Sequence, residues 1–161
     1  MITVALVEPE IPQNTGNIAR LCAATRTPLH IVGSAGFRLD DRAVRRAGLD
    51  YWSEVTLHRH RDLDALNQCL PAATFVYLSK KVERPYFKRK FTVNDCLVFG
   101  SETRGLPEEL LRRNWEQCLT IPMLNPRVRS LNLANSVAIV LYEALRQTGT
   151  FNLGTSSETE S

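Results

Sequence analysis

Three polar segments of the sequence carry side chains that could take part in group transfer. Each follows a short apolar run: 8–20 reads EPEIPQNTGNIAR, 100–107 reads GSETRGLP, and 121–135 joins IPM to RSLNLAN. Carboxylate, amide, hydroxyl and guanidinium groups of this kind can orient a nucleophile or stabilise a developing charge. In open parallel sheets, ligands bind where strands end at their carboxyl ends. The three segments are therefore the candidates for a binding site.

Common nucleotide-binding and hydrolase motifs do not occur in these segments. Gly100 and Gly105 have the glycine spacing of a P-loop, but Leu106 and Pro107 stand where Lys and Ser or Thr are required. No G-x-G-x-x-G follows the first apolar run, and the chain has no G-x-S-x-G. The sequence therefore argues against NTP hydrolysis, dinucleotide binding, Rossmann-type methyl transfer and a serine hydrolase.

Each polar residue, taken alone, also has a purely structural explanation. Asn14 can cap the first helix, and Ser130 can cap the last one. Arg20 can be an exposed helical arginine, and Glu102 can pair with Arg104. A function has to come from the combination.

Apolar runs and helical patterns alternate along the whole chain. Strands are expected at 2–7, 29–33, 54–58, 74–78, 96–100 and 118–122. Helices are expected at 15–26, 40–47, 62–70, 107–113 and 131–147. Strands that are nearly all apolar and separated by helices indicate an α/β fold, a parallel sheet flanked by helices on both faces. We expect one domain over 1–149 and a disordered Ser/Thr/Glu-rich tail over 150–161.

The composition is that of an ordinary globular protein. The 161 residues are 43% hydrophobic and 23% charged, enough for one packed domain. No apolar run is long enough to span a membrane, and the N-terminus lacks the features of a signal peptide, so we expect a cytoplasmic protein. Four cysteines without a C-x-x-C predict buried reduced thiols. Three histidines without zinc spacing predict no metal site, with His58 and His60 in a solvated basic turn.

Basic residues gather in three places although the net charge is only +3. Residues 80–90 hold six of them against one acid, a second cluster lies at 42–46, and Arg127 and Arg129 form a third. One such cluster alone is usually a solvated surface, but three in a small chain favour a polyanionic partner.

The last predicted helix is apolar on more than one face. One stripe at helical spacing consists of Ala134, Val137, Ala138, Leu141, Tyr142 and Leu145. Ile139 and Val140 add apolar surface on the other side. Such a helix is buried on both faces, either inside the domain or against another subunit. We expect it to form part of a homodimer interface.

Taken together, the three segments resemble the three motifs of the SPOUT class of RNA methyltransferases. These are N-T-G-N-I-A-R, F-G-S-E-T-R-G-L-P, and I-P-M followed by R-S-L-N-L-A-N. The stretches RRAGLDY at 45–51 and YEALRQ at 142–147 are similar to the YibK/TrmL type, the tRNA wobble-position 2′-O-methyltransferases. The resemblance covers 2–147. It departs at Gln13, where a second proline is typical, and in a slightly long link from Met123 to Arg129.

The resemblance implies a fold, a cofactor and partners. The fold is the SPOUT α/β knot, in which the last helix threads through a loop as a deep trefoil knot. The methyl donor is S-adenosylmethionine (SAM), without a metal. The partners are tRNA and a second copy of the chain, joined through the first and last helices. The residues implied to hold SAM are Leu78, Gly100, Glu102, Ile121, Met123, Ser130 and Leu131.

The resemblance also implies a reaction site and an RNA surface. The reaction site consists of Arg20, Asn14, Glu102, Ser130 and Asn132. Arg20 corresponds to the residue nearest the acceptor hydroxyl. Because guanidinium essentially keeps its proton in proteins, we expect it to stabilise the developing alkoxide or to grip the adjacent phosphate. The residues expected to contact RNA are Arg45, Arg46, Lys88, Arg89 and Tyr142.

Three functions remain open at this point. The first is 2′-O-methylation of the tRNA wobble nucleotide, a cytidine or a modified uridine. The second is the same reaction at another tRNA position or in rRNA, and the third is a non-catalytic RNA-binding dimer. The joint presence of Arg20, Glu102, Ser130 and Asn132 favours an enzyme, since a binding module needs none of them in this arrangement.

Overall fold

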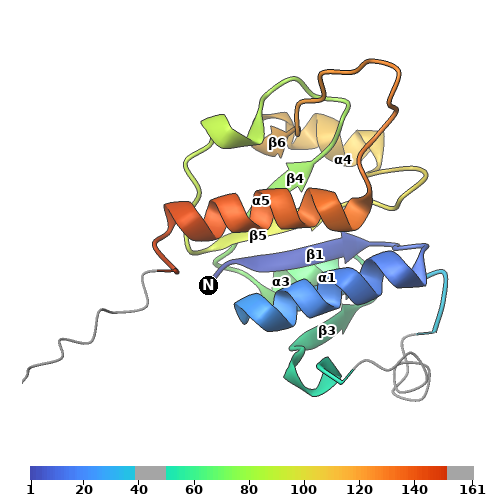
Figure 1. The fold of residues 1–161 in the computed structure, drawn as a ribbon, viewed down its shortest axis with the longest axis vertical. Coiled ribbons are helices and arrows are strands. Elements are labelled where there is room, and N and C mark those ends of the chain that lie inside the picture. The colour runs from blue at the N-terminus through green and yellow to red at the C-terminus, as the bar shows by residue number, and fades with distance from the viewer. Residues whose placement is uncertain (39–49, 152–161) are drawn as a thin grey trace, which may run out of the picture.

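A single six-stranded parallel sheet organises the molecule (Figure 1). The structure is a computed structural model that describes residues 1–38 and 50–151. The order of strands in the sheet is β3-β2-β1-β5-β4-β6. Their bounds are Thr3–Val7 for β1, Leu29–Val32 for β2, Leu57–His60 for β3, Thr74–Leu78 for β4, Asp95–Phe99 for β5 and Cys118–Leu119 for β6.

Helices cover both faces of this sheet. The longer ones are α1 (Pro12–Thr25) and α5 (Leu133–Gln147), which lie side by side over one face (Figure 1). The short helices α3 (Leu63–Cys69) and α4 (Glu108–Arg113) pack on the other. Three short 3-10 turns complete the set: η1 (Trp52–Glu54), η2 (Tyr86–Lys88) and η3 (Trp115–Gln117). The expected parallel α/β architecture is confirmed.

The two central strands show why the sequence reads as it does. Every residue of β1 and β5 is buried, and the two strands pair with each other from Thr3↔Cys96 to Leu6↔Phe99. With helices on both faces, a strand has no wet side, so its sequence shows no alternation. None of the helices within 1–38 and 50–151 is both long and apolar enough to cross a membrane.

Within the described residues, the predicted elements occur in the predicted order, and three of their ends lie three residues from the expected positions. Helix α1 begins at Pro12 and not at residue 15. The strand expected at 54–58 begins later, because Trp52–Glu54 forms η1 and the pairing with β2 starts at Leu57. The strand expected at 118–122 ends at Leu119. The helix expected at 40–47, with Arg45 and Arg46, lies outside the described residues, as does the tail from 152 onward.

The end of β6 is gripped by the loop that follows β4. Leu119 pairs with Leu78, and its carbonyl accepts a hydrogen bond from Ser79 (2.9 Å). Next to it, the N–H of Thr120 donates to Arg84 (2.8 Å) and its carbonyl accepts from Tyr86 (2.9 Å). The chain at 118–120 therefore lies between β4 and the 84–86 segment of the same loop.

The C-terminal end of α5 fastens the far side of that loop. The Gln147 side chain accepts from the N–H of Phe91 (2.9 Å) and donates to the carbonyl of Arg89 (3.1 Å). The loop from β4 to β5 is thus bonded both to β6 and to the last helix, the two parts of the chain that the knot expected from the resemblance would bring against it.

A buried carboxylate holds the base of this loop. Asp95 is fully buried, and its oxygens accept from Arg89 (3.3 Å), from the Thr92 N–H (3.1 Å) and from the Thr92 hydroxyl (2.9 Å). A charge in this environment needs such partners, because burial without them is costly. Arg89, expected as an RNA contact, therefore has an internal partner.

Helix α5 is apolar on two faces, but the faces differ from those expected. Val140 packs in the core together with Val137, Leu141 and Leu145. Tyr142 and Ile139 are the exposed apolar residues, 46% and 36% accessible. The Tyr142 ring lies 5.3 Å from that of Phe151, centroid to centroid. Val140, expected on the side opposite the stripe, is therefore buried with it, and Tyr142, expected in the stripe, is exposed.

The thiols follow the sequence prediction with one exception. Cys22, Cys96 and Cys118 are buried and free, and burial raises the pKa of the Cys22 thiol to about 12. Cys69, at the end of α3, is exposed. The prediction of burial is therefore wrong for Cys69.

The three histidines form a cluster and not a solvated turn. His30 on β2 is buried and faces His58 and His60 on β3, with ring centroids 4.8 and 5.1 Å apart. Nδ1 of His30 and Nε2 of His60 lie 2.8 Å apart and share one hydrogen bond. Among the described residues, no group of three potential ligands fits a metal ion. Burial, reinforced by its two neighbours, lowers the pKa of His30 to about 4.

We expect this cluster to make the fold acid-sensitive. Unfolded His30 takes up a proton near pH 6.5, whereas folded His30 stays neutral until about pH 4. The free energy of unfolding should therefore fall as the pH drops from 6.5 to 5, by up to about 1.4 kcal/mol per pH unit for this group. Urea denaturation at each pH measures it. His30→Leu should flatten the decline, and a variant that keeps the full wild-type slope would contradict this origin.

Candidate active site

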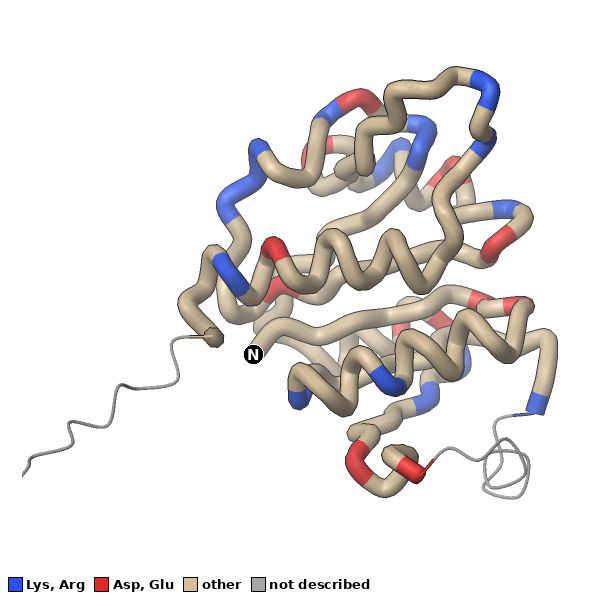
Figure 2. Tube along the Cα trace, in the orientation of Figure 1, with Lys and Arg blue, Asp and Glu red and all other residues tan. Residues whose placement is uncertain are grey.

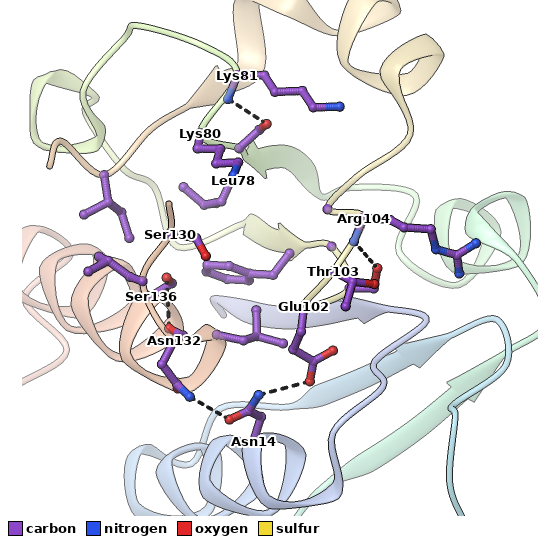
Figure 3. Close-up of a pocket in the computed structure, with 18 of the residues that line it drawn as sticks. Asn14, Leu78, Lys80, Lys81, Glu102, Thr103, Arg104, Ser130, Asn132 and Ser136 are labelled. Carbon is purple, nitrogen blue, oxygen red and sulfur yellow. Dashed lines mark hydrogen bonds between the residues drawn. The ribbon is translucent and has the colours of Figure 1, made fainter. Parts of the chain in front are cut away.

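A pocket of about 680 Å³ opens at the carboxyl ends of β4, β5 and β6 (Figure 3). All seven residues expected to hold the cofactor line it: Leu78, Gly100, Glu102, Ile121, Met123, Ser130 and Leu131. Four of the five residues expected at the reaction site also line it, namely Asn14, Glu102, Ser130 and Asn132. Segments that lie far apart in the sequence thus meet in one cavity, as the sequence predicts.

Glu102 closes the start of α1. Its carboxylate accepts hydrogen bonds from the N–H groups of Glu10 (2.8 Å) and Ile11 (3.0 Å) and from the Asn14 amide (3.2 Å). The N-cap residue Ile11 has no side chain that could cap the helix, and Pro12 follows it. A negative charge at a helix N-terminus also interacts favourably with the helix dipole. Glu102, in the loop after β5, therefore fixes the chain immediately before α1 and the Asn14 side chain in the first turn of that helix.

The expected pairing of Glu102 with Arg104 is wrong. Arg104 lies near Glu8 (3.7 Å) and Glu10 (3.9 Å), and the Thr103 hydroxyl donates to Glu10 (2.8 Å). Arg104 itself is 73% exposed, so these two ion pairs are weak. Arg104 and Thr103 therefore contact the side chain of Glu10, whereas the Glu102 carboxylate is bound at the start of α1.

Asn14 and Asn132 connect α1 to α5. The Asn132 amide donates to Oδ1 of Asn14 (2.9 Å), while its own oxygen accepts from the N–H groups of Ala134 (2.8 Å) and Asn135 (3.3 Å). Asn132 is thus the N-cap of α5, and the alternative in which Ser130 caps that helix is wrong. Asn14 is only 6% exposed and uses both ends of its amide. Figure 3 shows the resulting series Asn132, Asn14, Glu102 along one side of the pocket.

A tight turn sets the position of Glu102. The N–H of Gly105 donates to the carbonyl of Ser101 (2.9 Å), and Gly105 has a φ of +66°, a conformation that favours glycine. A Cβ on Gly100 would overlap the backbone of Gly105 and Leu106. Glycine is therefore required at both ends of the turn, for two different reasons.

Arg20 is the one predicted reaction-site residue that does not line the pocket. It is exposed on α1, with its guanidinium 5.5 Å from the centre of the Tyr51 ring. It lies six residues beyond Asn14, which on a helix is about 9 Å along the axis and about 240° around it. Within one chain, Arg20 therefore faces away from the other site residues.

Several pocket residues were not expected from the sequence. Lys80, Lys81, Thr103, Leu133 and Ser136 all line the cavity. The two lysines follow β4 directly, so the rule that ligands bind at the carboxyl ends of strands could have found them. Because both lysines belong to the basic cluster at 80–90, the sequence suggested that they bind RNA phosphates.

Comparison with known proteins supports this picture. Residues 1–142 match the SpoU rRNA Methylase family. A protein of Burkholderia cenocepacia named tRNA (cytidine(34)-2′-O)-methyltransferase is 49% identical over 153 residues, which cover 92% of this chain and 97% of that protein.

Solved structures agree with the sequence comparison. One that concerns 2-OH methylation of C/U34 on tRNA has a TM-score of 0.84 at 46% identity, covering 91% of this chain and 95% of that chain. The SpoU methyltransferase AviRb from Streptomyces viridochromogenes, in complex with the cofactor AdoMet, has a TM-score of 0.76 at 27% identity over 91% of this chain and 57% of its own. The expected SPOUT fold is confirmed, and the chain belongs to the SpoU methylase family of RNA methyltransferases.

Proposed function

We propose that this protein transfers a methyl group from SAM to the ribose 2′-hydroxyl of the wobble nucleotide of tRNA, in the cytoplasm and as a homodimer. The relatives named above for the cytidine at position 34 support the substrate. The observation that carries the proposal is the series Asn132, Asn14, Glu102, which joins the three SPOUT motifs around one cavity.

The cavity suits a methyl donor of the size and character of SAM. Its volume of about 680 Å³ falls in the range of small-molecule sites. Apolar side chains from three loops, among them Leu78, Ile121 and Leu131, can enclose a flat adenine ring. When bound, SAM supplies an electrophilic methyl group on a sulfonium sulfur. Holding the acceptor oxygen in line with that methyl is the main demand on the protein.

The site residues divide into those that position and those that can touch the acceptor. Asn14, Glu102 and Asn132 use their polar atoms on one another and on the ends of α1 and α5. We assign them the role of positioning residues. The Ser130 hydroxyl is exposed at the pocket and has no hydrogen-bond partner among the described residues, so it is available to a bound ligand.

Arg20 needs a second subunit to reach a pocket. In its own chain it lies on the outer side of α1, away from the cavity. A dimer formed through α1 and α5 would cover Ile139 and Tyr142 and would bring Arg20 of the partner subunit toward Ser130. There its guanidinium would stabilise the developing alkoxide or hold the neighbouring phosphate, without giving up a proton.

Lys88 is the RNA contact that the described residues support best. It is exposed on η2, whereas Arg89 is bound to Asp95, and Arg45 and Arg46 lie outside the described residues. Tyr142 is exposed on α5, where the dimer interface is proposed. We therefore place the phosphate contacts first at Lys88 and its neighbour Lys90.

Mapping the methylated nucleotide tests the function. Incubation of the purified protein with methyl-labelled SAM and total tRNA, followed by nuclease mapping, should place one 2′-O-methyl group at the wobble position. Label at another tRNA position, or in rRNA only, would replace the proposed substrate. Absence of any transfer, with RNA still bound, would favour a non-catalytic binding dimer.

Subunit mixing tests the placement of Arg20. Arg20→Ala and Ser130→Ala should each lower kcat by about 100-fold or more, the usual effect of losing a transition-state contact. A mixed dimer of the two variants keeps one intact composite site. Random mixing should therefore restore about a quarter of wild-type activity. If separately tagged mixed dimers stay as inactive as their parents, Arg20 does not act across the interface.

The salt dependence of tRNA binding tests the proposed phosphate contact. Lys88→Gln should lower the slope of log K against log salt concentration by about 0.7 to 0.9, the value for one released counterion. The matched control is Arg61→Gln, since Arg61 is exposed after β3, at the opposite edge of the sheet, and pairs with Asp62. Equal slopes for wild type and Lys88→Gln would exclude this contact.

A further inference from the structure

One wall of the pocket is an eight-residue loop that has little holding it. Residues 124–131 connect Met123 to the N-cap of α5, and all of them are exposed, Leu124 completely. Ser130 and Leu131 in this loop line the cavity. None of the side chains of this wall is fully buried.

In the part of the chain that the structure describes, two of the three hydrogen bonds of this loop join residues of the loop itself. Asn125 accepts from the N–H of Arg127 (3.0 Å) through its side chain and from that of Val128 (3.2 Å) through its carbonyl. Within the described residues, one hydrogen bond ties 124–131 to another part of the chain: Nζ of Lys80 donates to the carbonyl of Arg129 (3.1 Å). This bond ends next to Ser130.

Lys80 is well placed to act as an anchor because its neighbours are fixed. The N–H of Ser79 donates to Leu119 of β6 (2.9 Å), and Nζ of Lys81 donates to Glu108 of α4 (3.1 Å). Lys80 itself lines the pocket, on the side where Ser130 also lies (Figure 3). Figure 2 shows basic positions both on this side of the β4–β5 loop and on the 124–131 loop that faces it.

We propose that Lys80 is a positioning residue that tethers the 124–131 loop and thereby preforms the methyl-donor pocket. A segment without buried contacts opens easily, and each opening removes Ser130 and Leu131 from the wall. The tether shifts that equilibrium toward the closed wall before the ligand arrives, so the ligand does not have to order the loop itself. The assignment of the pocket to SAM rests on the proposed function, whereas the tether does not depend on it.

Limited trypsin digestion of the ligand-free protein reads the tether directly. The loop holds two cleavage sites, after Arg127 and after Arg129, and the tethered carbonyl belongs to the second scissile bond. Lys80→Met keeps the aliphatic stem but removes the donor. Cleavage at both sites should become faster by up to about fivefold, the factor by which one net hydrogen bond changes the equilibrium between closed and open loop. Lys80→Arg, which can still donate, should restore most of the protection.

Two further measurements separate the tether from other roles. The affinity for SAM, measured by calorimetry without RNA, should also fall in Lys80→Met. The factor of this loss multiplied by the factor of faster cleavage should be about five, because the closed loop binds SAM and the open loop is cut. Arg61→Met removes an exposed basic side chain after β3, at the opposite edge of the sheet and outside the pocket, and should change neither quantity. Cleavage after Arg20 in α1 reports global unfolding and should stay at the wild-type rate.

The opposite results overturn the proposal. Weaker SAM binding with unchanged cleavage of the ligand-free loop would mean that Lys80 contacts the ligand directly. Unchanged cleavage and unchanged affinity would mean that the hydrogen bond does no positioning. Faster cleavage at all sites, including Arg20, would mean loss of the fold. Because the cleavage assay contains neither SAM nor RNA, failure of the methyl-transfer proposal would leave its outcome unaffected.

Discussion

The active site depends on one carboxylate that caps a helix from another part of the chain. Helix α1 begins at Pro12 without a capping side chain of its own, and Glu102 at the end of β5 accepts hydrogen bonds from two N–H groups there and from Asn14. This interaction fixes the first motif against the second. Asn14 then fixes both against Asn132 at the start of α5. Among the described residues, no other group accepts a hydrogen bond from the N–H groups of Glu10 and Ile11.

This arrangement gives residues that look catalytic in the sequence a different role. Amides and carboxylates whose polar atoms are already bound to the protein have little left to offer a substrate. In the proposed function they define the shape of the pocket, and the chemistry falls to groups with unused hydrogen-bonding capacity, of which the Ser130 hydroxyl is one. A similar division holds in the β4–β5 loop, where Arg89 is bound to buried Asp95 while Lys88 remains exposed.

Much of this structure could be predicted from the sequence, for identifiable reasons. Buried strands such as β1 (Thr3–Val7) have nearly unbroken apolar sequences, and α3 begins after an aspartate, Asp62, whose side chain caps it by accepting from Ala65 (2.8 Å). Motif residues such as Asn14 and Glu102 meet as expected, because parallel strands bring their carboxyl ends to one edge. The sequence could not reveal which face of α5 is covered, because Val140 and Tyr142 are both apolar and only packing separates them. The sequence also could not reveal on which side of α1 Arg20 lies, because the order of the motifs does not determine which side of a helix faces the cavity.

We expect Glu102, Asn14 and Asn132 to act as one unit in shaping the pocket. A double-mutant cycle for SAM affinity with Glu102→Gln and Asn132→Ala measures this most directly, because the two side chains touch only through Asn14. If the three side chains act as one unit, the losses of SAM-binding free energy in the two single variants are not additive. The coupling should be about 1 kcal/mol or more, as for members of one hydrogen-bond network. Additive losses, within about 0.3 kcal/mol, would show independent residues and would contradict the account.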